Sequence, residues 1–289
     1  MSDPADVLVD LHAEGGELDA IVGELTEEQW GRATPAPGWS VAHQIAHLAW
    51  TDRAALLAIT DGDGFAAEVE KALAAPERFV DDGAEEGAAL PSGELLARWR
   101  EGRERLEEAL RGVPAGGRFP WYGPPMSAPA MATARLMETW AHGQDVADAL
   151  GVVRKPTARL RHVAWIGHRA RDYAYLVRGE QPPGEPVRVE LVSPDGESWT
   201  YGPEGAAQRV TGDALEFCLL VTQRVHRDDT ALRAEGADAE HWLRIAQAFA
   251  GPAGTGRPAG TGRPAGTGRP AGTGRPAGTG RPAGGGEEE

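Results

Sequence analysis

The sequence predicts a mainly α-helical protein in which a helical bundle is followed by a small α+β domain and a disordered repeat tail. Residues 1–178 carry apolar side chains at near-helical spacing. Residues 179–251 open with two segments of alternating character, as strands do, and continue into helices. Residues 252–289 repeat a hexapeptide that contains no large apolar side chain. We therefore expect boundaries between these three parts of the chain after residues 178 and 251.

The first helix is predicted over residues 4–25, where valine, leucine and isoleucine recur at near-helical spacing. Thr26, with Gln29 three residues later, has the pattern of a capping box that opens a short turn. Pro35 and Pro37 then require a loop, because proline cannot continue a helix.

Five further helical segments follow in the predicted bundle. Ser40 and Ser92 are suitable N-caps, and Gly151 is suited to the left-handed position that ends a helix. Acidic, glycine-containing loops are expected after residue 75, and a loop rich in Gly, Pro and aromatic residues over 112–125. The predicted helices cover residues 40–59, 65–75, from 92 onward, about 130–150, and 157–178.

The last folded part is predicted to begin with a hairpin. Residues 187–192 and 198–201 alternate in strand fashion around a turn at 194–196, which reads Pro-Asp-Gly. Helices are expected from residue 212 to 225 and from 237 to 250. Strands and helices of this size make a small α+β domain.

Composition excludes several classes of protein. The formal net charge of −15 argues against nucleic-acid binding, which needs a basic surface. No apolar run approaches the length of about 18 residues that a membrane span needs. Cys218 is the only cysteine, so no internal disulfide can form, and we expect a cytoplasmic protein in which this thiol is a buried small residue. Motifs for a nucleophilic serine, a P-loop, a CxxC pair or a dinucleotide-binding turn are absent from the sequence.

The tail repeats Pro-Ala-Gly-Thr-Gly-Arg five times, from residue 252 to 281. It should be disordered, because it offers no apolar surface to offset its conformational entropy. One interpretation is that its arginines contact an acidic surface, including one of this protein; the other is a replication-slippage expansion without a role. These arginines are Arg257, Arg263, Arg269, Arg275 and Arg281.

Glu138 and His142 form the pair that carries the most chemical information. They lie four residues apart in a predicted helix, so both side chains project from one face and could reach one divalent ion. The alternative is a surface ion pair or a buried hydrogen-bonded pair. Apolar neighbours on both sides weaken that alternative, because a buried charge needs a partner or a metal.

A histidine upstream could complete a three-ligand site. His43 and His47 also lie four residues apart, so spacing alone permits either one. With Ser40 as N-cap, His43 occupies the third helical position, from which a side chain turns back to cap the helix. His47 lies one turn deeper among apolar neighbours. We therefore predict His47, Glu138 and His142 as the metal ligands, an arrangement that leaves one side of the ion open.

Neighbouring residues suggest supporting roles. Asp145 could accept a hydrogen bond from the ring nitrogen of His142 that faces away from the metal. Arg135 could hold the Glu138 carboxylate or a substrate anion, or equally make a surface salt bridge. Aromatic side chains close to these motifs in sequence could wall a pocket or simply pack in the core: Trp39, Trp50, Trp121 and Tyr122.

The segments around these ligands resemble a known family. They read Pro37-Gly-Trp-Ser-Val-Ala-His-Gln-Ile-Ala-His47-Leu-Ala-Trp-Thr-Asp52 and Arg135-Leu-Met-Glu138-Thr-Trp-Ala-His142-Gly-Gln-Asp145. Both are similar to segments of the mycothiol-dependent maleylpyruvate isomerase family, which belongs to the DinB/YfiT-like metal-binding proteins. The resemblance covers roughly residues 5–250 and points to the family's largely uncharacterised metal-binding branch, which also carries a wyosine-base-formation label.

The resemblance carries expectations about fold and site. It implies a DinB-like four-helix bundle followed by a sterol-carrier-like α+β domain. It implies zinc as the metal, with the family's ligands falling on His47, Glu138 and His142. The family also uses a C-terminal arginine near the active site, for which Arg224 is the nearest match and Arg227 a rival.

These features lead to one favoured functional hypothesis and two alternatives. The favoured one is a divalent-metal enzyme that uses a low-molecular-weight thiol, mycothiol, to conjugate or isomerise a small electrophile. One alternative keeps the metal but uses bound water, which makes a hydrolase. The other is a non-catalytic binding protein whose metal stabilises the fold while the C-terminal domain holds a lipid or small molecule. We expect a monomer or a homodimer.

Overall fold

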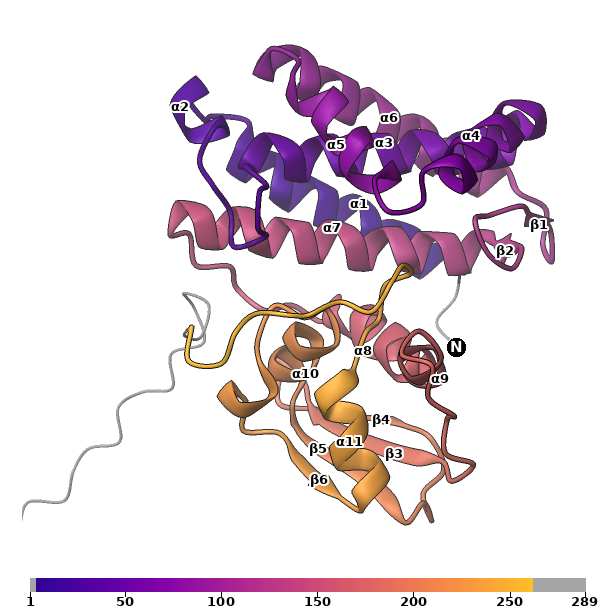
Figure 1. Ribbon diagram of the computed structural model, residues 1–289, viewed down its shortest axis with the longest axis vertical. Helices are drawn as coiled ribbons and strands as arrows, with labels where there is room; N and C mark the ends of the chain where they lie inside the picture. Colours follow the sequence, from indigo (N-terminus) through magenta and orange to yellow (C-terminus); the bar gives the residue numbers. More distant parts are fainter. Residues whose placement is uncertain (1–3, 262–289) are drawn as a thin grey trace, which may run out of the picture.

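The computed structural model describes residues 4–261, with side chains from residue 6 onward. Its upper layer in Figure 1 is a four-helix bundle, in which the third long helix in sequence packs on the second and the fourth packs on the first two. The long helices are α1 (Pro4–Val22), α3 (Val41–Thr60), α6 (Ser92–Gly112) and α7 (Ala128–Leu150). Short helices lie between them: α2 (Glu27–Trp30), α4 (Gly62–Ala74) and α5 (Phe79–Ala88).

The predicted helix ends are largely confirmed. Thr26 and Gln29 form the capping box of α2, with 2.9 Å between the Thr26 amide and Oε1 of Gln29. Ser40 caps α3, and Gly151 ends α7 with a φ of 71°. Ser92 was expected to be the N-cap of α6 but is its first residue, because the preceding proline takes the cap position.

The lower layer in Figure 1 is the C-terminal unit, in which helices pack on one face of a small mixed sheet, where Val187, Val189 and Leu191 are buried. The sheet has the order β4-β3-β5-β6, and β3 runs antiparallel to β4 but parallel to β5. Its strands are β3 (Val187–Val192), β4 (Ser198–Tyr201), β5 (Gln208–Asp213) and β6 (Arg233–Glu235). The helices are α8 (Leu160–Arg169), α9 (Arg171–Leu176), α10 (Ala214–Val221) and α11 (Ala237–Ile245), with the 3-10 turn η1 (Arg227–Asp229).

The β3–β4 hairpin is where the sequence predicted it, whereas β5 and β6 were missed. Val210 is the only large apolar residue of β5 and is fully buried, so the strand carries almost no alternating pattern. It is a strand because it lies between β3 and β6 and pairs with both. The hairpin of β1 (Arg118–Phe119) and β2 (Met126–Ser127) falls at the edges of the expected 112–125 loop.

Helix α5 replaces the loop expected after residue 75. Two of its glycines face α3, where a Cβ on Gly83 would lie 2.9 Å from the Trp50 ring and one on Gly87 would lie 2.7 Å from Ala46 Cβ. Glycine is unfavourable in an isolated helix, which is why the sequence reads as a loop. Here it allows the two helices to approach closely.

The helix expected over residues 157–178 is two helices, α8 and α9, with a break at Ala170. Both pack against the C-terminal unit, α8 on α10 and α9 on α11, and α8 also contacts α7. A division after residue 178 therefore separates α8 from α10 and α9 from α11, while it keeps α8 with α7. The larger of the two apolar cores runs without interruption from α7 through α8 to Phe217 and Trp242.

Cys218 is fully buried in this core, as predicted, and burial raises the pKa of its thiol well above the ordinary value. No helix among residues 4–261 is both long and apolar enough to span a bilayer.

The tail differs from the prediction over its first ten residues. Disorder was expected from Pro252, but residues 252–261 follow a defined path along the protein. Charged and backbone hydrogen bonds, among them that between Arg257 and Asp145, compensate for the missing apolar surface. Residues 262–289 lie outside the described part of the chain.

Candidate metal centre

Two helices that are far apart in sequence bring the three predicted ligands together. His47 lies on α3, and Glu138 and His142 lie one turn apart on α7. Nε2 of His142 is 3.1 Å from Oε2 of Glu138, and Nε2 of His47 is 3.4 Å from the same oxygen. One ligand atom from each residue lies within 4.8 Å of the other two. This spacing suits one ion between the three side chains.

A chain of hydrogen bonds determines which nitrogen of His142 carries its proton. Thr34 Oγ1 donates to the Trp39 carbonyl, at 2.8 Å, and so accepts from Nε2 of Gln44, at 2.9 Å. The amide oxygen of Gln44 therefore faces Nδ1 of His142 and accepts its proton. Nε2 of His142 is left with a free electron pair directed at the cluster, which is the form that binds a metal.

The ring of His47 is held by packing. Its centroid lies 5.4 Å from that of Trp39 and 6.0 Å from that of Trp50. Trp39 also stacks on His142 at 5.9 Å, so one indole covers both imidazoles. Nδ1 of His47 is buried without a hydrogen-bond partner among residues 6–261. The orientation of this ring therefore depends on its aromatic neighbours and on Glu138.

The electrostatics keep the ligands in their metal-binding forms. Burial lowers the pKa of His142 to about 4, and the neighbouring His47 lowers it further, so the imidazole is neutral at pH 7. Burial acts to raise the pKa of Glu138, but the neighbouring imidazoles of His142 and His47 hold it well below the ordinary value. A carboxylate and a neutral imidazole need no proton loss to bind a cation.

The residues present therefore fit a divalent ion. Two nitrogens and one oxygen form a donor set that zinc accepts, as do iron and nickel. The Glu138 side chain keeps 20% of its surface exposed, against 9% for His47. One side of the cluster is thus partly accessible to solvent.

His43 lies outside the cluster, as expected for a capping residue. Its Nδ1 is 2.7 Å from Oγ of Ser40, and its Nε2 is 2.9 Å from Glu85 on α5. Trp39 also connects helix α5 to the site, because its indole N–H donates to Asp81 on that helix at 3.1 Å.

The suggested hydrogen bond between Asp145 and His142 is absent, because Gln44 bonds that imidazole nitrogen. Of the alternatives for Arg135, it is the salt bridge that forms, but it is buried. Arg135 pairs with Asp52 on α3, with 2.8 Å between Nε and Oδ1. Gln44 was missed because nothing in its local sequence marks it; it lies three residues before His47 and becomes relevant only when α7 packs on α3.

Arg224 reaches the bundle from the C-terminal unit. Its Nη2 is 2.8 Å from Oδ2 of Asp145, one turn after His142 on α7, and its Nη1 donates to the Thr222 carbonyl. Its Nε is buried and has no partner in the described part of the chain. The rival Arg227 instead pairs with Glu240 of the C-terminal unit.

The four aromatic residues separate into two groups. Trp39 and Trp50 contact the ligand imidazoles, as described above. Trp121 stacks on Phe65 at 5.6 Å, and Tyr122 lies 5.5 Å from Phe79. Phe79 in turn packs on Trp50 at 4.8 Å, so an aromatic cluster extends from the ligands to the β1–β2 hairpin.

The chain is similar to known proteins over most of its length. The family of mycothiol maleylpyruvate isomerase N-terminal domains matches residues 11–147, a range that contains all three clustered residues. The family described as wyosine base formation matches residues 183–235. Two proteins from strains of Mycobacterium tuberculosis, each named as uncharacterized, are 57% identical over 257 residues, which make up 89% of this chain and 100% of each relative.

Among solved structures, the chain resembles the mycothiol-dependent maleylpyruvate isomerase and a histidine-to-alanine mutant of that enzyme. Each matches with a TM-score of 0.52 and 17% sequence identity, over 77% of this chain and 90% of the solved chain. At this level of identity the likeness shows a shared fold.

Proposed function

Because the chain belongs to the mycothiol maleylpyruvate isomerase family, we propose that it is a divalent-metal-dependent enzyme that uses a low-molecular-weight thiol. The thiol is mycothiol in this proposal, and the reaction is the isomerisation or conjugation of a small electrophile. The cluster of His47, Glu138 and His142 is the observation that carries the proposal.

His47, Glu138 and His142 would hold the ion, which is zinc in this proposal. When bound, a divalent cation stabilises a thiolate and so lowers the pKa of the thiol that donates it. Gln44 keeps the proton of His142 on the nitrogen that faces away from the ion. Trp39 and Trp50 cover the imidazoles and exclude water from that side of the cluster.

Arg224 is the candidate group for an anionic substrate or for the carboxylate of a thiol. It approaches α7 one turn from His142, and its charge acts on that imidazole. The thiolate sulfur would form one bond to an electrophilic carbon. Conjugation ends with a proton on the adduct, whereas isomerisation breaks the same C–S bond again and releases the thiol.

The first experiment measures the metal content of purified protein for the wild type, His47→Ala and His43→Ala. The two histidines lie one turn apart on α3, but only His47 belongs to the cluster. We expect near-stoichiometric metal in the wild type and in His43→Ala, and its loss in His47→Ala. Absence of metal from the wild type after zinc addition would refute the metal-dependent mechanism and favour a binding protein.

The second experiment tests the thiol. Turnover of candidate electrophiles is measured with and without mycothiol, in the wild type and in Glu138→Gln. We expect activity that needs both the thiol and Glu138. Metal-dependent turnover without any thiol would instead identify a hydrolase. We further expect a cytoplasmic monomer or homodimer, which fractionation and light scattering would test.

A further inference from the structure

The first copy of the tail repeat, residues 252–257, lies between α7 and the C-terminal unit. In Figure 1 this yellow segment leaves α11, rises to α7 and then runs along the boundary between the two layers. It is therefore in a position to contact both units at once.

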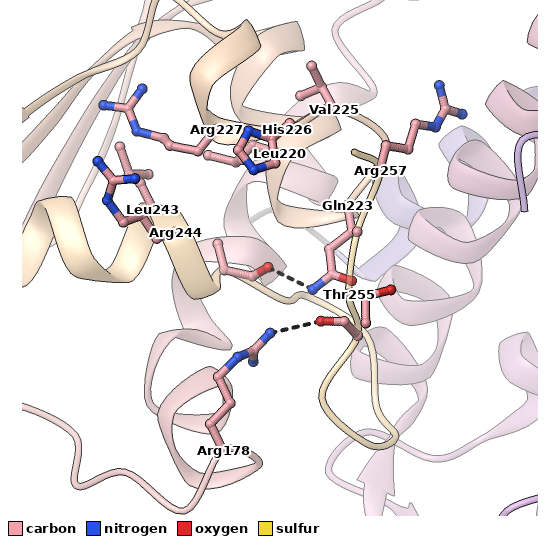
Figure 2. Close-up of a pocket in the computed structure, with 13 residues that line it drawn as sticks. Arg178, Leu220, Gln223, Val225, His226, Arg227, Leu243, Arg244, Thr255 and Arg257 are labelled. Carbon is pink, nitrogen blue, oxygen red and sulfur yellow. Dashed lines mark hydrogen bonds between the residues drawn. The ribbon is translucent and has the colours of Figure 1, made fainter. Parts of the chain in front are cut away.

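The protein binds the backbone of this segment at several points. The Gly254 amide donates to Oε1 of Gln247 at 3.0 Å. Arg178 donates to the Gly254 carbonyl at 3.1 Å, a bond that Figure 2 shows as a dashed line. Further along, the Gly260 amide donates to the Asp229 carboxylate at 2.9 Å. These bonds involve the backbone of the tail and not its side chains. They therefore determine the path of the segment.

The path also favours glycine at two positions of the repeats. Gly256 has a φ of 63° and Gly260 a φ of 74°, in the region that favours glycine. A Cβ on Gly254 would lie 2.1 Å from Oε1 of Gln223, so the end of that side chain, which lines the cavity in Figure 2, would have to move.

Arg257 binds the segment to helix α7 of the bundle. Its two terminal nitrogens each lie 2.7 Å from a carboxylate oxygen, one of Asp145 and one of Asp148, and its side chain is only 14% exposed. The two aspartates are three residues apart on α7, so they form an acidic pair on one helix face. The contact with Asp145 is a charge-assisted hydrogen bond, which gives strength and orientation, and the contact with Asp148 adds an ion pair.

We propose that α7 and the C-terminal unit together form a recognition site for the Pro-Ala-Gly-Thr-Gly-Arg unit, and that residues 252–257 act as a strap across it. Asp145 lies at the centre of the strap, because it binds Arg257 through one oxygen and Arg224 through the other. Docking of the strap thereby holds the C-terminal unit, and Arg224 with it, against the helix that carries Glu138 and His142. The proposal does not depend on the thiol chemistry, because none of its contacts involves the three clustered residues.

Hydrogen exchange in the full-length chain tests the strap directly. Mass spectrometry measures protection of the amides of residues 250–261 in the wild type, Arg257→Gln and Asp148→Asn. We expect each variant to exchange about tenfold faster in this segment, the change that loss of one charge-assisted contact brings. Arg263→Gln is the matched control, since it removes the arginine at the same position of the next repeat and should leave protection unchanged. Unchanged exchange in α1 confirms that each variant is folded.

A competing peptide tests recognition of the sequence itself. Free acetyl-Gly-Pro-Ala-Gly-Thr-Gly-Arg-Pro-amide, at the millimolar concentrations needed to match an intramolecular segment, should raise exchange at residues 250–261. The same peptide with Gln in place of Arg should have no effect. Protection that is equal in the wild type and Arg257→Gln, or that Arg263→Gln lowers equally, would overturn the proposal, as would equal competition by both peptides.

Discussion

Gln44 on α3 accepts the Nδ1 proton of His142 on α7, and this contact decides which imidazole nitrogen faces the candidate metal. Gln44 is itself oriented by Thr34, to which its amide nitrogen donates. Gln44, which is not a candidate ligand itself, thus leaves Nε2 of His142 unprotonated and able to bind the ion.

Replacement of Gln44 by Met should lower metal affinity about 10- to 100-fold, the usual effect of losing a partner that orients a ligand histidine. Gln144→Met is the control, because this glutamine on α7 is also buried and its side chain bonds Asp148 instead of a clustered residue. Competition against a chromophoric chelator measures both affinities. Equal affinity for the two variants would contradict the role of Gln44.

Arg224→Gln should lower kcat/KM for an anionic substrate roughly 10- to 100-fold, because a charge-assisted contact is lost. Metal content should not change, since Arg224 bonds Asp145 and none of the clustered residues. Arg233→Gln, at an exposed arginine of β6, is the control. Loss of metal from the Arg224 variant would show that it supports the ligands rather than the substrate.

Arg135→Met should destabilise the protein by about 3 kcal/mol, because it leaves Asp52 buried without its partner. Burial already raises the pKa of Asp52, and Arg135 is the main opposing influence. Arg98→Met breaks an exposed pair with Glu94 and should cost at most about 1 kcal/mol. Urea unfolding compares the two, and similar losses would mean that the buried pair contributes no more than the exposed one.

Gly87→Ala should destabilise the packing of α5 on α3 by about 1–3 kcal/mol, since the new Cβ would lie 2.7 Å from Ala46. Gly93→Ala on α6 meets nothing within 4 Å and should be neutral or stabilising by up to about 1 kcal/mol. Urea unfolding, with hydrogen exchange in α5, measures both. If Gly87→Ala accelerated exchange only in helices other than α5, the contact of Gly87 with α3 would not be the source of the destabilisation.

His168 should make stability depend on pH. Burial lowers its pKa in the folded state below the ordinary value of 6.5. The unfolded state therefore binds more protons below about pH 6.5, and the free energy of unfolding falls as the pH falls from 7 to 5. His168→Gln should reduce this fall. Urea unfolding at both pH values, with a chelator present, gives the comparison; identical pH dependence in the wild type and the variant would exclude a contribution from His168.

Local sequence was sufficient for several helix ends and for the choice of the three clustered residues. The capping box at Thr26 and Gln29, the Ser40 cap and the Gly151 end all depend on contacts within a few residues. Glu138 and His142 share a helix face through their spacing alone. The proximity of His47 to them was predictable because His43 was needed for capping.

The sequence by itself thus determined the elements with strong local patterns and the identity of the three clustered residues. Only the tertiary structure decided the partners of these residues: Gln44 for His142, Asp52 for Arg135, and Asp145 for both Arg224 and Arg257. It also made β5 a strand and α5 a helix, against their local composition. The physical reason is the same in each case: these contacts join residues that are distant along the chain, and their free energy exists only once α3, α7 and the C-terminal unit pack together.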